Sequence, residues 1–312
     1  LGQCRRRRLP PPGLHPLSYA DPMFVATDLH GHTHFSDGRA TPEEYVEFRR
    51  QLGMKAIAIC DHDVLGAVRR GAQAAERAQM LFIPGMEVTS FLHFGTDRAE
   101  QFHVLAYFPS SYLEGFRLES TALYKRGLLV QERWRSFVLA WLHELPTEDR
   151  EAIDREGELE RLPAPLFPAL QTMITRIVER HRPLFEAFRD HHVHFWEGAE
   201  NRDIFGWSPE EAIDAIRGDG AVDIVAHPVR YRDKERTSSV LELASGHEVY
   251  TSRHKAEVSE RFRELAESKR KFWTSSSDDH QNAPYARPPC GTPVRTLERI
   301  CHRAMPVSWL LA

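Results

Sequence analysis

Short runs of apolar, β-favouring residues recur along this 312-residue chain, and helical patterns separate several of them. Two helical patterns open at residues 41–44 and 208–211, where a hydroxyl residue precedes Pro-Glu-Glu in the manner of a capping box. Strands that alternate with helices are typical of parallel βα units, so the chain is predicted to form an α/β fold with a closed or doubly wound sheet. The predicted strands cover residues 23–26, 56–60, 80–83, 104–108, 222–226, 248–250 and 271–274.

This alternation breaks between about residues 110 and 206, where the sequence becomes charged and helical in pattern. Residues 128–142 and 170–188 carry apolar side chains three and four positions apart, the spacing of an amphipathic helix. We expect a helical insertion that packs over one end of the sheet, although further helices of the same domain would give the same pattern. The histidine cluster at residues 191–194 is interpreted as a packing or solvated cluster rather than a set of metal ligands.

The composition is that of a globular protein, with 41% hydrophobic and 28% charged residues. No apolar run approaches the roughly 20 residues that a membrane helix requires, so we expect no membrane partner. The formal net charge of −4 gives no overall attraction to nucleic acid, and no stable nucleic-acid complex is expected.

Residues 1–20 contain four consecutive arginines and three consecutive prolines, without the apolar stretch that completes a secretory signal. We expect a disordered leader there. The four cysteines lack the paired spacing of a disulfide framework or a zinc ribbon. This pattern favours a reducing, cytoplasmic location, in which any metal must rely on nitrogen and oxygen ligands.

Histidine and carboxylate side chains gather beside the predicted strands. Alternate residues of an extended segment face the same side, so His30 and His32 can grip one metal ion, with Asp28 as a candidate to support them. Clusters that converge from different strand ends can build a multinuclear metal site. The signatures are Asp28-Leu29-His30-Gly31-His32 with Asp37, Asp61-His62-Asp63, Glu87, His103, His227-Pro228 and Asp278-Asp279-His280.

Three of these signatures carry alternatives. Asp61-His62-Asp63 follows a predicted strand and suits a metal ligand with an orienting carboxylate, although Asp and His are common in loops. Glu87 follows an apolar run, and its carboxylate could bridge two ions, although a single Glu before Val-Thr carries no signal by itself. His103 precedes its predicted strand rather than following it, and His93 is an alternative for the same position.

Taken in order, the signatures resemble the polymerase and histidinol phosphatase (PHP) superfamily, and they are most similar to its small-molecule phosphoesterase branch. The resemblance covers about residues 24–300. It implies a distorted (β/α)7 barrel over residues 21–312, with the helical insertion at about residues 110–206. It also implies a centre of two to three divalent ions, and mixed histidine and carboxylate ligands would accept Mn²⁺, Zn²⁺ or Fe²⁺.

Carried over residue by residue, the resemblance implies three groups of ligands. The first metal ion would be held by His30, His32, Glu87 and Asp278. Glu87 would bridge to a second ion, completed by His103 and His227. The third ion would be held by Asp37, His62 and His280. Asp279 adjoins Asp278, which leaves open which of the two aspartates binds.

The resemblance implies a metal-dependent phosphoesterase that hydrolyses a small phosphate monoester, such as a nucleotide. Two cations about 3.5–4 Å apart would lower the pKa of a bridging water, and the resulting hydroxide would attack phosphorus in line. Asp61 and Asp63 are candidate catalytic residues. Arg230, Arg253 and His254 are candidates for binding phosphate, with surface salt bridges as the alternative for the arginines. His254 could also protonate the leaving oxygen.

Three other functions remain open. A nuclease that trims short oligonucleotides would use the same centre on diesters, and an open groove lined with arginines and aromatic residues would favour it. A catalytically silent PHP-type scaffold would not need its ligand positions filled, and here every position is filled. A hydrolase of C–N bonds is disfavoured by the absence of a suitable bridging lysine after a strand.

Overall fold

The computed structural model describes residues 23–252, 254–285, 287 and 289–305. The leader expected at residues 1–20 lies outside the described residues. Seven strands form one curved sheet whose order follows the chain: β2 (Thr27–Asp28), β3 (Ala56–Ile59), β4 (Leu81–Leu92), β5 (Glu100–Tyr107), β6 (Val222–Val225), β7 (Gly246–Tyr250) and β8 (Phe272–Ser275). All neighbouring pairs are parallel except those of β5, which runs antiparallel to both β4 and β6. A separate antiparallel pair joins β1 (Phe24–Val25) to β9 (Thr292–Pro293).

The two edges of the sheet meet beyond the ends of β2 and β8. Gly31 and Asp279 form a parallel bridge, and the Asp278 N–H donates to the His30 carbonyl oxygen at 2.8 Å. Inside the curve, the Tyr107 hydroxyl donates to the Leu29 carbonyl oxygen at 2.7 Å, which links β5 to the segment after β2. These contacts nearly close the sheet and confirm the predicted distorted (β/α)7 barrel.

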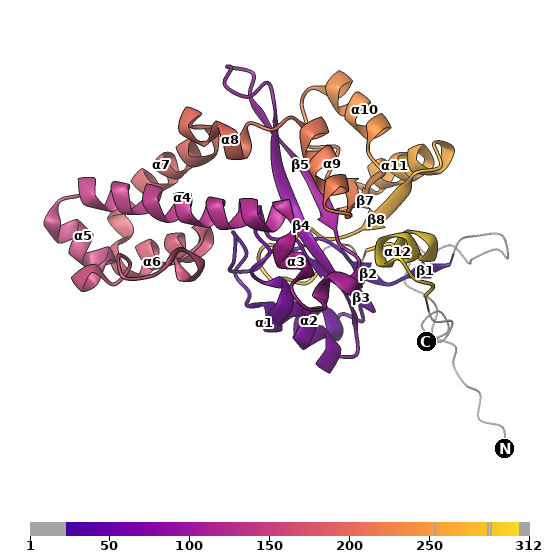
Figure 1. Cartoon of the computed structure of the whole chain (residues 1–312), viewed down its shortest axis with the longest axis horizontal. Helices are drawn as coiled ribbons and strands as arrows, with labels where there is room; N and C mark the ends of the chain where they lie inside the picture. The colour runs from indigo at the N-terminus through magenta and orange to yellow at the C-terminus, as the bar shows by residue number, and fades with distance from the viewer. Residues whose placement is uncertain (1–22, 253, 286, 288, 306–312) are drawn as a thin grey trace.

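Helices cover the outside of the barrel (Figure 1). Thr41 and Ser208 both form the predicted capping boxes, at the starts of α1 and α9. Alternate residues of β3 face opposite sides, so Ile57 and Ile59 pack in the outer cluster with the helices, whereas Ala58 belongs to an inner cluster. The covering helices are α1 (Pro42–Gln51), α2 (Val68–Arg77), α9 (Pro209–Gly218), α10 (Lys234–Leu243) and α11 (Ala256–Ser268). The last helix, α12 (Val294–Cys301), instead packs Leu297 and Ile300 into the inner cluster.

Two strand boundaries differ from the prediction. β4 continues to Leu92, so Glu87 lies within the strand rather than after it. β5 begins at Glu100, so His103 also lies within a strand, opposite Thr89. Because β5 is antiparallel, its first half reaches the same end of the barrel as the carboxyl ends of β3 and β6. The reversed direction explains how a histidine ahead of the predicted run still faces the site.

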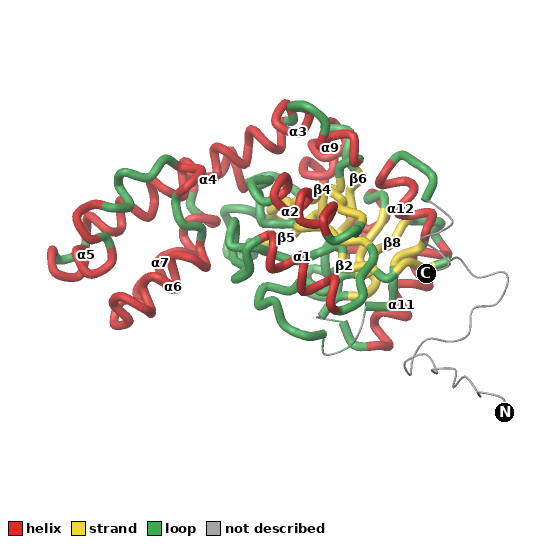
Figure 2. Tube along the Cα trace, turned by 90° about the horizontal axis from the view of Figure 1, so that it is seen from below, coloured by secondary structure: helices red, strands yellow, loops and turns green. Residues whose placement is uncertain are grey.

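The segment between β5 and β6 is helical, as predicted, and extends to one side of the barrel (Figures 1 and 2). Its aromatic core includes Trp134, Trp141 and Phe188. The pattern at residues 170–188 forms two helices rather than one, because Pro183 lacks the N–H that a continuous helix needs. The helices are α3 (Arg117–Ser120), α4 (Ala122–Glu144), α5 (Thr147–Ile153), α6 (Leu170–His181), α7 (Phe185–Glu197) and α8 (Arg202–Phe205). The 3-10 turns are η1 (Ser110–Leu113), η2 (Arg155–Gly157), η3 (Ala164–Leu166), η4 (Arg182–Leu184) and η5 (Ala199–Asn201).

Within the described residues, every helix is too short or too polar to cross a membrane.

Candidate metal centre

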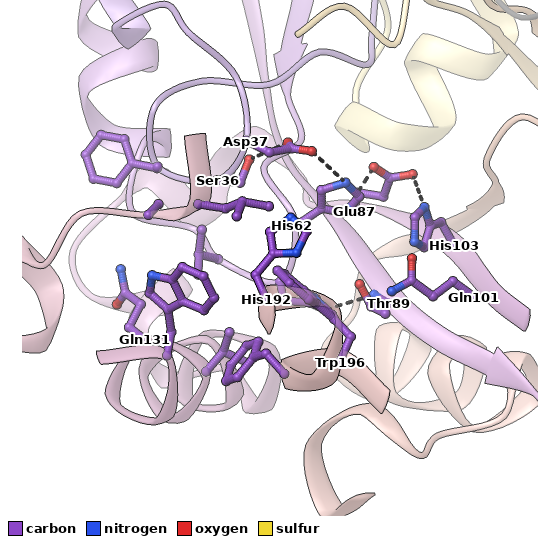
Figure 3. A pocket seen from close by; sticks show the side chains of 18 of the residues that line it. Ser36, Asp37, His62, Glu87, Thr89, Gln101, His103, Gln131, His192 and Trp196 are labelled. Carbon is purple, nitrogen blue, oxygen red and sulfur yellow. Dashed lines mark hydrogen bonds and ion pairs between the residues drawn. The ribbon is translucent and has the colours of Figure 1, made fainter. Parts of the chain in front are cut away.

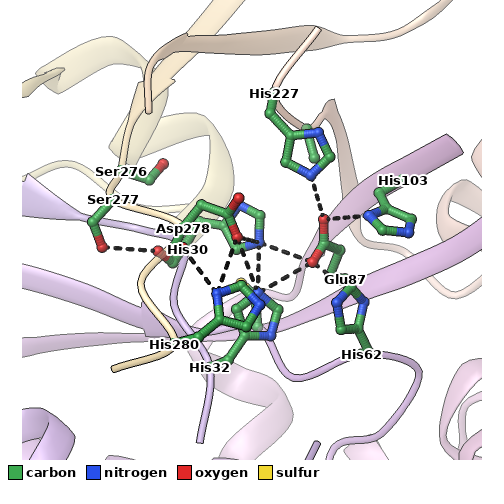
Figure 4. A network of polar contacts seen from close by, with 12 residues as sticks. His30, His32, His62, Glu87, His103, His227, Ser276, Ser277, Asp278 and His280 are labelled. Atoms are coloured by element: carbon green, nitrogen blue, oxygen red, sulfur yellow. Dashed lines mark hydrogen bonds and ion pairs between the residues drawn. The ribbon is translucent and has the colours of Figure 1, made fainter. Parts of the chain in front are cut away.

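Side chains from the sheet and from the loops that follow β2, β3, β6 and β8 converge on one centre (Figure 4). The structure places all nine predicted metal ligands there: His30, His32, Asp37, His62, Glu87, His103, His227, Asp278 and His280. Residues scattered over 250 positions therefore meet in space.

The first group consists of His30, His32, Glu87 and Asp278, and all four are buried. The Nε2 atoms of His30 and His32 lie 3.0 and 3.2 Å from Glu87 Oε2, and 3.1 Å from each other. Asp278 Oδ1 lies 3.6 Å from the first of these nitrogens and 3.4 Å from the second. Tetrahedral ligands at about 2.0–2.2 Å from a zinc ion stand about 3.3–3.6 Å apart, so these four atoms are spaced much as such a site requires.

Glu87 offers its second oxygen to a different group. Its Oε1 lies 2.9 Å from His103 Nδ1 and 3.0 Å from His227 Nε2. His62 Nδ1 lies 3.3 Å from the other oxygen, Oε2, so His62 stands between this group and the next. The carboxylate is thus placed to bridge two ions.

The third group is more open to solvent. Asp37 Oδ2 lies 3.2 Å from His280 Nε2 and 3.7 Å from His62 Nε2, while Asp37 Oδ1 lies 3.5 Å from His32 Nδ1. All three residues predicted for the third ion are thus together, with the far side of His32 beside them.

The protonation of the centre suits a metal ion. Burial acts to lower the pKa of His32, but Asp278, Asp37 and Glu87 outweigh it and raise that pKa to about 10. Burial acts to raise the pKa of Glu87, but the surrounding histidines hold it well below its usual range. Bound metal ions would replace the protons that these carboxylates stabilise on the imidazoles.

Two imidazole nitrogens in the centre are buried without a hydrogen bond to any described residue. His62 Nδ1 and His103 Nδ1 have no hydrogen-bond partner among the described residues, although both lie close to the Glu87 carboxylate. Burial lowers the pKa of His62 to about 4, so its imidazole is neutral and keeps a lone pair for coordination. Buried polar atoms without partners are costly, and a metal ion would satisfy both. The residues present therefore fit divalent ions.

Glu248 is a supporting residue that the sequence signatures missed. Its Oε1 lies 3.0 Å from His30 Nδ1 and accepts a hydrogen bond from the Ser276 hydroxyl at 2.7 Å. Its Oε2 accepts from the His227 N–H at 2.7 Å. The sequence offered only a carboxylate inside the predicted strand 248–250; the structure shows that it is fully buried, where such a group needs partners.

The structure distinguishes the two neighbouring aspartates. Asp278 belongs to the first group, whereas the Asp279 carboxylate pairs with the buried Arg49 and accepts from the Gln281 N–H. Arg49 also donates to Asp28, whose carboxylate accepts from the N–H and hydroxyl of Ser277, each at 2.8 Å. Asp28 thus anchors the turn that presents Asp278.

The two predicted catalytic aspartates hold loops in place. Asp61 accepts hydrogen bonds from Thr33 N–H, Thr33 Oγ1 and Ser36 Oγ, which fixes the loop that carries Asp37. Asp63 accepts from the Thr89 N–H and pairs with Arg126. Neither aspartate belongs to a candidate group of metal donors among the described residues.

Three of the described non-glycine residues with positive φ lie at the centre. Asp63, His227 and Asp278 have φ values of 56°, 28° and 55°, in or near the left-handed region that residues other than glycine rarely adopt. Each follows a strand and adjoins or belongs to the centre. Strain of this kind persists where the surroundings over-determine the backbone, which is typical of functional sites.

A cavity of about 930 Å³ lies between the centre and the helical segment (Figure 3). Arg230 is exposed and lines it, and its guanidinium forms no ion pair with any described residue. Arg253 lies outside the described residues. His254 is buried, with Nδ1 2.8 Å from the Val249 carbonyl oxygen and its ring stacked on Phe262, and it is not among the residues that line the cavity. These contacts favour a packing role for it.

The alternative to His103 does not reach the centre. His93 Nε2 lies 3.0 Å from Asp233 Oδ2, in a half-exposed pair at the tip of the β4–β5 hairpin. The histidine cluster at residues 191–194 lies on α7, where His191 stacks on Phe137 and His192 faces the cavity (Figure 3). These contacts favour a packing role for His191, whereas His192 has an unforeseen place in the cavity wall.

Comparisons with known proteins identify relatives of this chain. A family model described as "PHP domain" matches residues 28–180. The chain is 27% identical over 271 residues to a 3',5'-nucleoside bisphosphate phosphatase from Chromobacterium violaceum, covering 81% of this chain and 86% of that protein. It is 25% identical over 259 residues to a phosphoribosyl 1,2-cyclic phosphate 1,2-diphosphodiesterase from Eggerthella lenta, covering 81% and 93%.

Error-prone DNA polymerases also match, but only in part. The protein from Cutibacterium acnes is 36% identical over 77 residues, which cover 24% of this chain and 7% of the polymerase. Among solved structures, a protein from Bifidobacterium adolescentis described as a metal-dependent phosphoesterase has a TM-score of 0.58 and 22% identity, covering 92% of this chain and 99% of that one. This structural likeness establishes the shared fold.

Proposed function

We propose that this chain, a member of the PHP family and a metal-dependent phosphoric ester hydrolase, hydrolyses a small phosphate monoester such as a nucleotide. The observation that carries the proposal is the cavity of about 930 Å³, which joins the candidate metal centre to a wall built by the helical segment. Pockets of about 300–1,000 Å³ suit small molecules rather than long polymers. The two relatives matched over more than 80% of their length have names that specify small phosphorylated molecules.

When bound, divalent ions in such a centre lower the pKa of a water and neutralise charge on phosphoryl oxygens. Hydrolysis joins a water oxygen to phosphorus, breaks the phosphorus–oxygen bond to the alcohol and leaves a proton on the departing oxygen. Arg230 would bind phosphoryl oxygens, because its guanidinium lies at the cavity without an ion pair to any described residue and suits bidentate contact. Glu248 and Asp28 would hold the ligand-bearing segments in position, and α4, α6 and α7 would exclude water from the cavity.

The test is hydrolysis of p-nitrophenyl phosphate and of bis(p-nitrophenyl) phosphate after loading with Mn²⁺ or Zn²⁺, together with the metal content of the protein. We expect two to three metal ions per chain and turnover of the monoester. Turnover of the diester alone would replace the monoesterase with a nuclease or another diesterase. Protein without bound metal would contradict the proposal altogether.

A nuclease remains the second candidate, because the same centre could act on a diester. A relative from Salmonella typhimurium named 5'-3' exoribonuclease Rnm is 26% identical over 226 residues, covering 66% of this chain and 67% of that protein. Short single-stranded oligonucleotides with a 5'-phosphate separate the candidates. A nuclease would shorten them stepwise, whereas a monoesterase would release inorganic phosphate and leave their length unchanged.

A further inference from the structure

The wall of the cavity that faces the metal centre is largely aromatic and apolar. Trp134 comes from α4, Leu166 and Phe167 from η3 and the loop after it, and Val193 and Trp196 from α7. Three separate parts of the helical segment thus direct apolar side chains to the same cavity as His62 and Glu87. A phosphate group alone makes polar contacts and would not cover this apolar surface.

Two of these side chains are among the exposed large apolar residues of the described chain. Leu166 is 69% exposed and Val193 is 43% exposed, although both lie within a segment that has an aromatic core of its own. Both line the same cavity, and apolar side chains left open to water around a cavity are typical of a binding site, because a ligand can bury them. The two residues lie on different elements, so their convergence is not explained by the pattern of one helix.

The volume of the cavity leads to the same conclusion. A phosphoryl group would occupy only the part beside the metal donors, and the cavity of about 930 Å³ is near the upper end of the range for small-molecule pockets. The remaining space must hold the alcohol part of an ester, which would then lie against the apolar wall.

The wall also carries a few polar groups. Figure 3 shows Gln131 on α4 and His192 and Trp196 on α7 around the cavity. His192 Nδ1 is buried and has no hydrogen-bond partner among the described residues. An apolar surface with amide and imidazole groups suits a flat ring that has polar atoms on its edge, since the faces stack and the edge forms hydrogen bonds.

Building on the proposed phosphomonoesterase, we propose that the helical segment forms a binding site for a planar aromatic or heteroaromatic group in the alcohol part of the substrate. Trp196, Leu166 and Val193 supply the apolar contact, and Gln131 and His192 bind the polar edge. The segment thereby selects the substrate, while the barrel carries the hydrolytic centre.

The test compares ethyl phosphate with 2-(1-naphthyl)ethyl phosphate, whose leaving alcohols have similar acidity. In the metal-loaded wild-type protein, we expect kcat/KM to be at least about tenfold higher for the naphthyl ester, because the ring buries apolar surface. Leu166→Ala and Trp196→Ala should each reduce this ratio several-fold. Leu128→Ala is the matched control, since Leu128 is an exposed leucine of α4 that does not line this cavity, and it should leave the ratio unchanged.

Calorimetry with 3-(1-naphthyl)propylphosphonate, which cannot be hydrolysed, separates this inference from the proposed function. If the naphthyl phosphonate binds more tightly than propylphosphonate, and Trp196→Ala weakens its binding, the aromatic site is supported even when no ester is turned over. Absence of turnover would then overturn only the monoesterase. Equal binding of the two phosphonates, or equal kcat/KM for the two esters, would overturn the aromatic site and leave the monoesterase standing.

Discussion

Arg126, on the long helix α4, forms a buried ion pair with Asp63, the residue that follows His62. The same guanidinium donates to the carbonyl oxygens of Thr89 on β4 and Ile204 on α8. Asp63 also accepts from the Thr89 N–H. One ion pair therefore connects the helical segment, the strand that carries Glu87 and the loop that carries a candidate metal donor.

Arg126→Met tests this connection. Removing one partner leaves the Asp63 carboxylate buried and unpaired, and we expect the free energy of unfolding to fall by about 3–5 kcal/mol. Thermal and urea denaturation would measure the loss. The double variant Arg126→Met with Asp63→Asn should recover much of the stability, because no unpaired charge remains. A double variant as unstable as the single one would show that Arg126 acts through its other contacts, the hydrogen bonds to the Thr89 and Ile204 carbonyl oxygens and the packing on Trp207, rather than through the ion pair.

Glu248→Gln tests the support of the centre. The amide keeps the size of the side chain but removes the charge beside His30 and replaces one acceptor oxygen with a donor. Because such supporting groups orient metal ligands, we expect metal affinity to fall about 10–100-fold with the fold retained. Metal titration followed by calorimetry would measure it, with circular dichroism as the check on folding. Unchanged metal affinity would leave Glu248 with a purely structural role.

His62→Ala and His280→Ala should each impair the third, more open group, which they form with Asp37. We expect the loss of about one metal ion per chain and a sharp fall in turnover, because each variant removes one of few donors. Elemental analysis of the dialysed protein would count the ions. Full metal content and full activity in either variant would remove that residue from the centre.

Much of this site could be predicted from the sequence because its chemistry follows strands in short, ordered signatures. His30-Gly31-His32 and Asp278-Asp279-His280 are far apart in the chain, yet both follow strands that meet where the barrel closes. Parallel strands bring their carboxyl ends to one edge, so the convergence of these signatures follows from the fold class. The helical character of the segment between β5 and β6 was likewise visible in its periodicity.

What the sequence did not reveal depends on contacts between distant segments. The antiparallel direction of β5, which brings His103 into the centre, leaves no local trace because both directions use the same alternation of side chains. Glu248 sits in a short strand as a single carboxylate, and only its partners His30 and His227 show its role. The exposed Leu166 and Val193 become a common surface only through the packing of the helical segment.

Asp278→Asn and Asp279→Asn should separate two roles that the sequence left ambiguous. The first removes a carboxylate donor from the buried group around His30, and we expect it to reduce metal content. The second weakens the ion pair with Arg49, and we expect it to lower the free energy of unfolding by about 1–3 kcal/mol while metal content is retained. The opposite result, metal loss only in Asp279→Asn, would reverse the assignment.

Arg230→Ala tests whether the Arg230 guanidinium at the cavity binds phosphate. We expect KM for the monoester to rise about tenfold or more with metal content unchanged, because charge-assisted hydrogen bonds to phosphoryl oxygens are lost. Arg232→Ala is the matched control: Arg232 is also exposed and lines the same cavity, but Glu100 already pairs with it, so its removal should change KM little. Arg230→Lys should recover only part of the loss, since an ammonium group cannot make the bidentate contact. Loss of metal in Arg230→Ala would instead mean that Arg230 supports the turn after His227. Equal effects of Arg230→Ala and Arg232→Ala on KM would mean that the net charge of the cavity, rather than one guanidinium, holds the substrate.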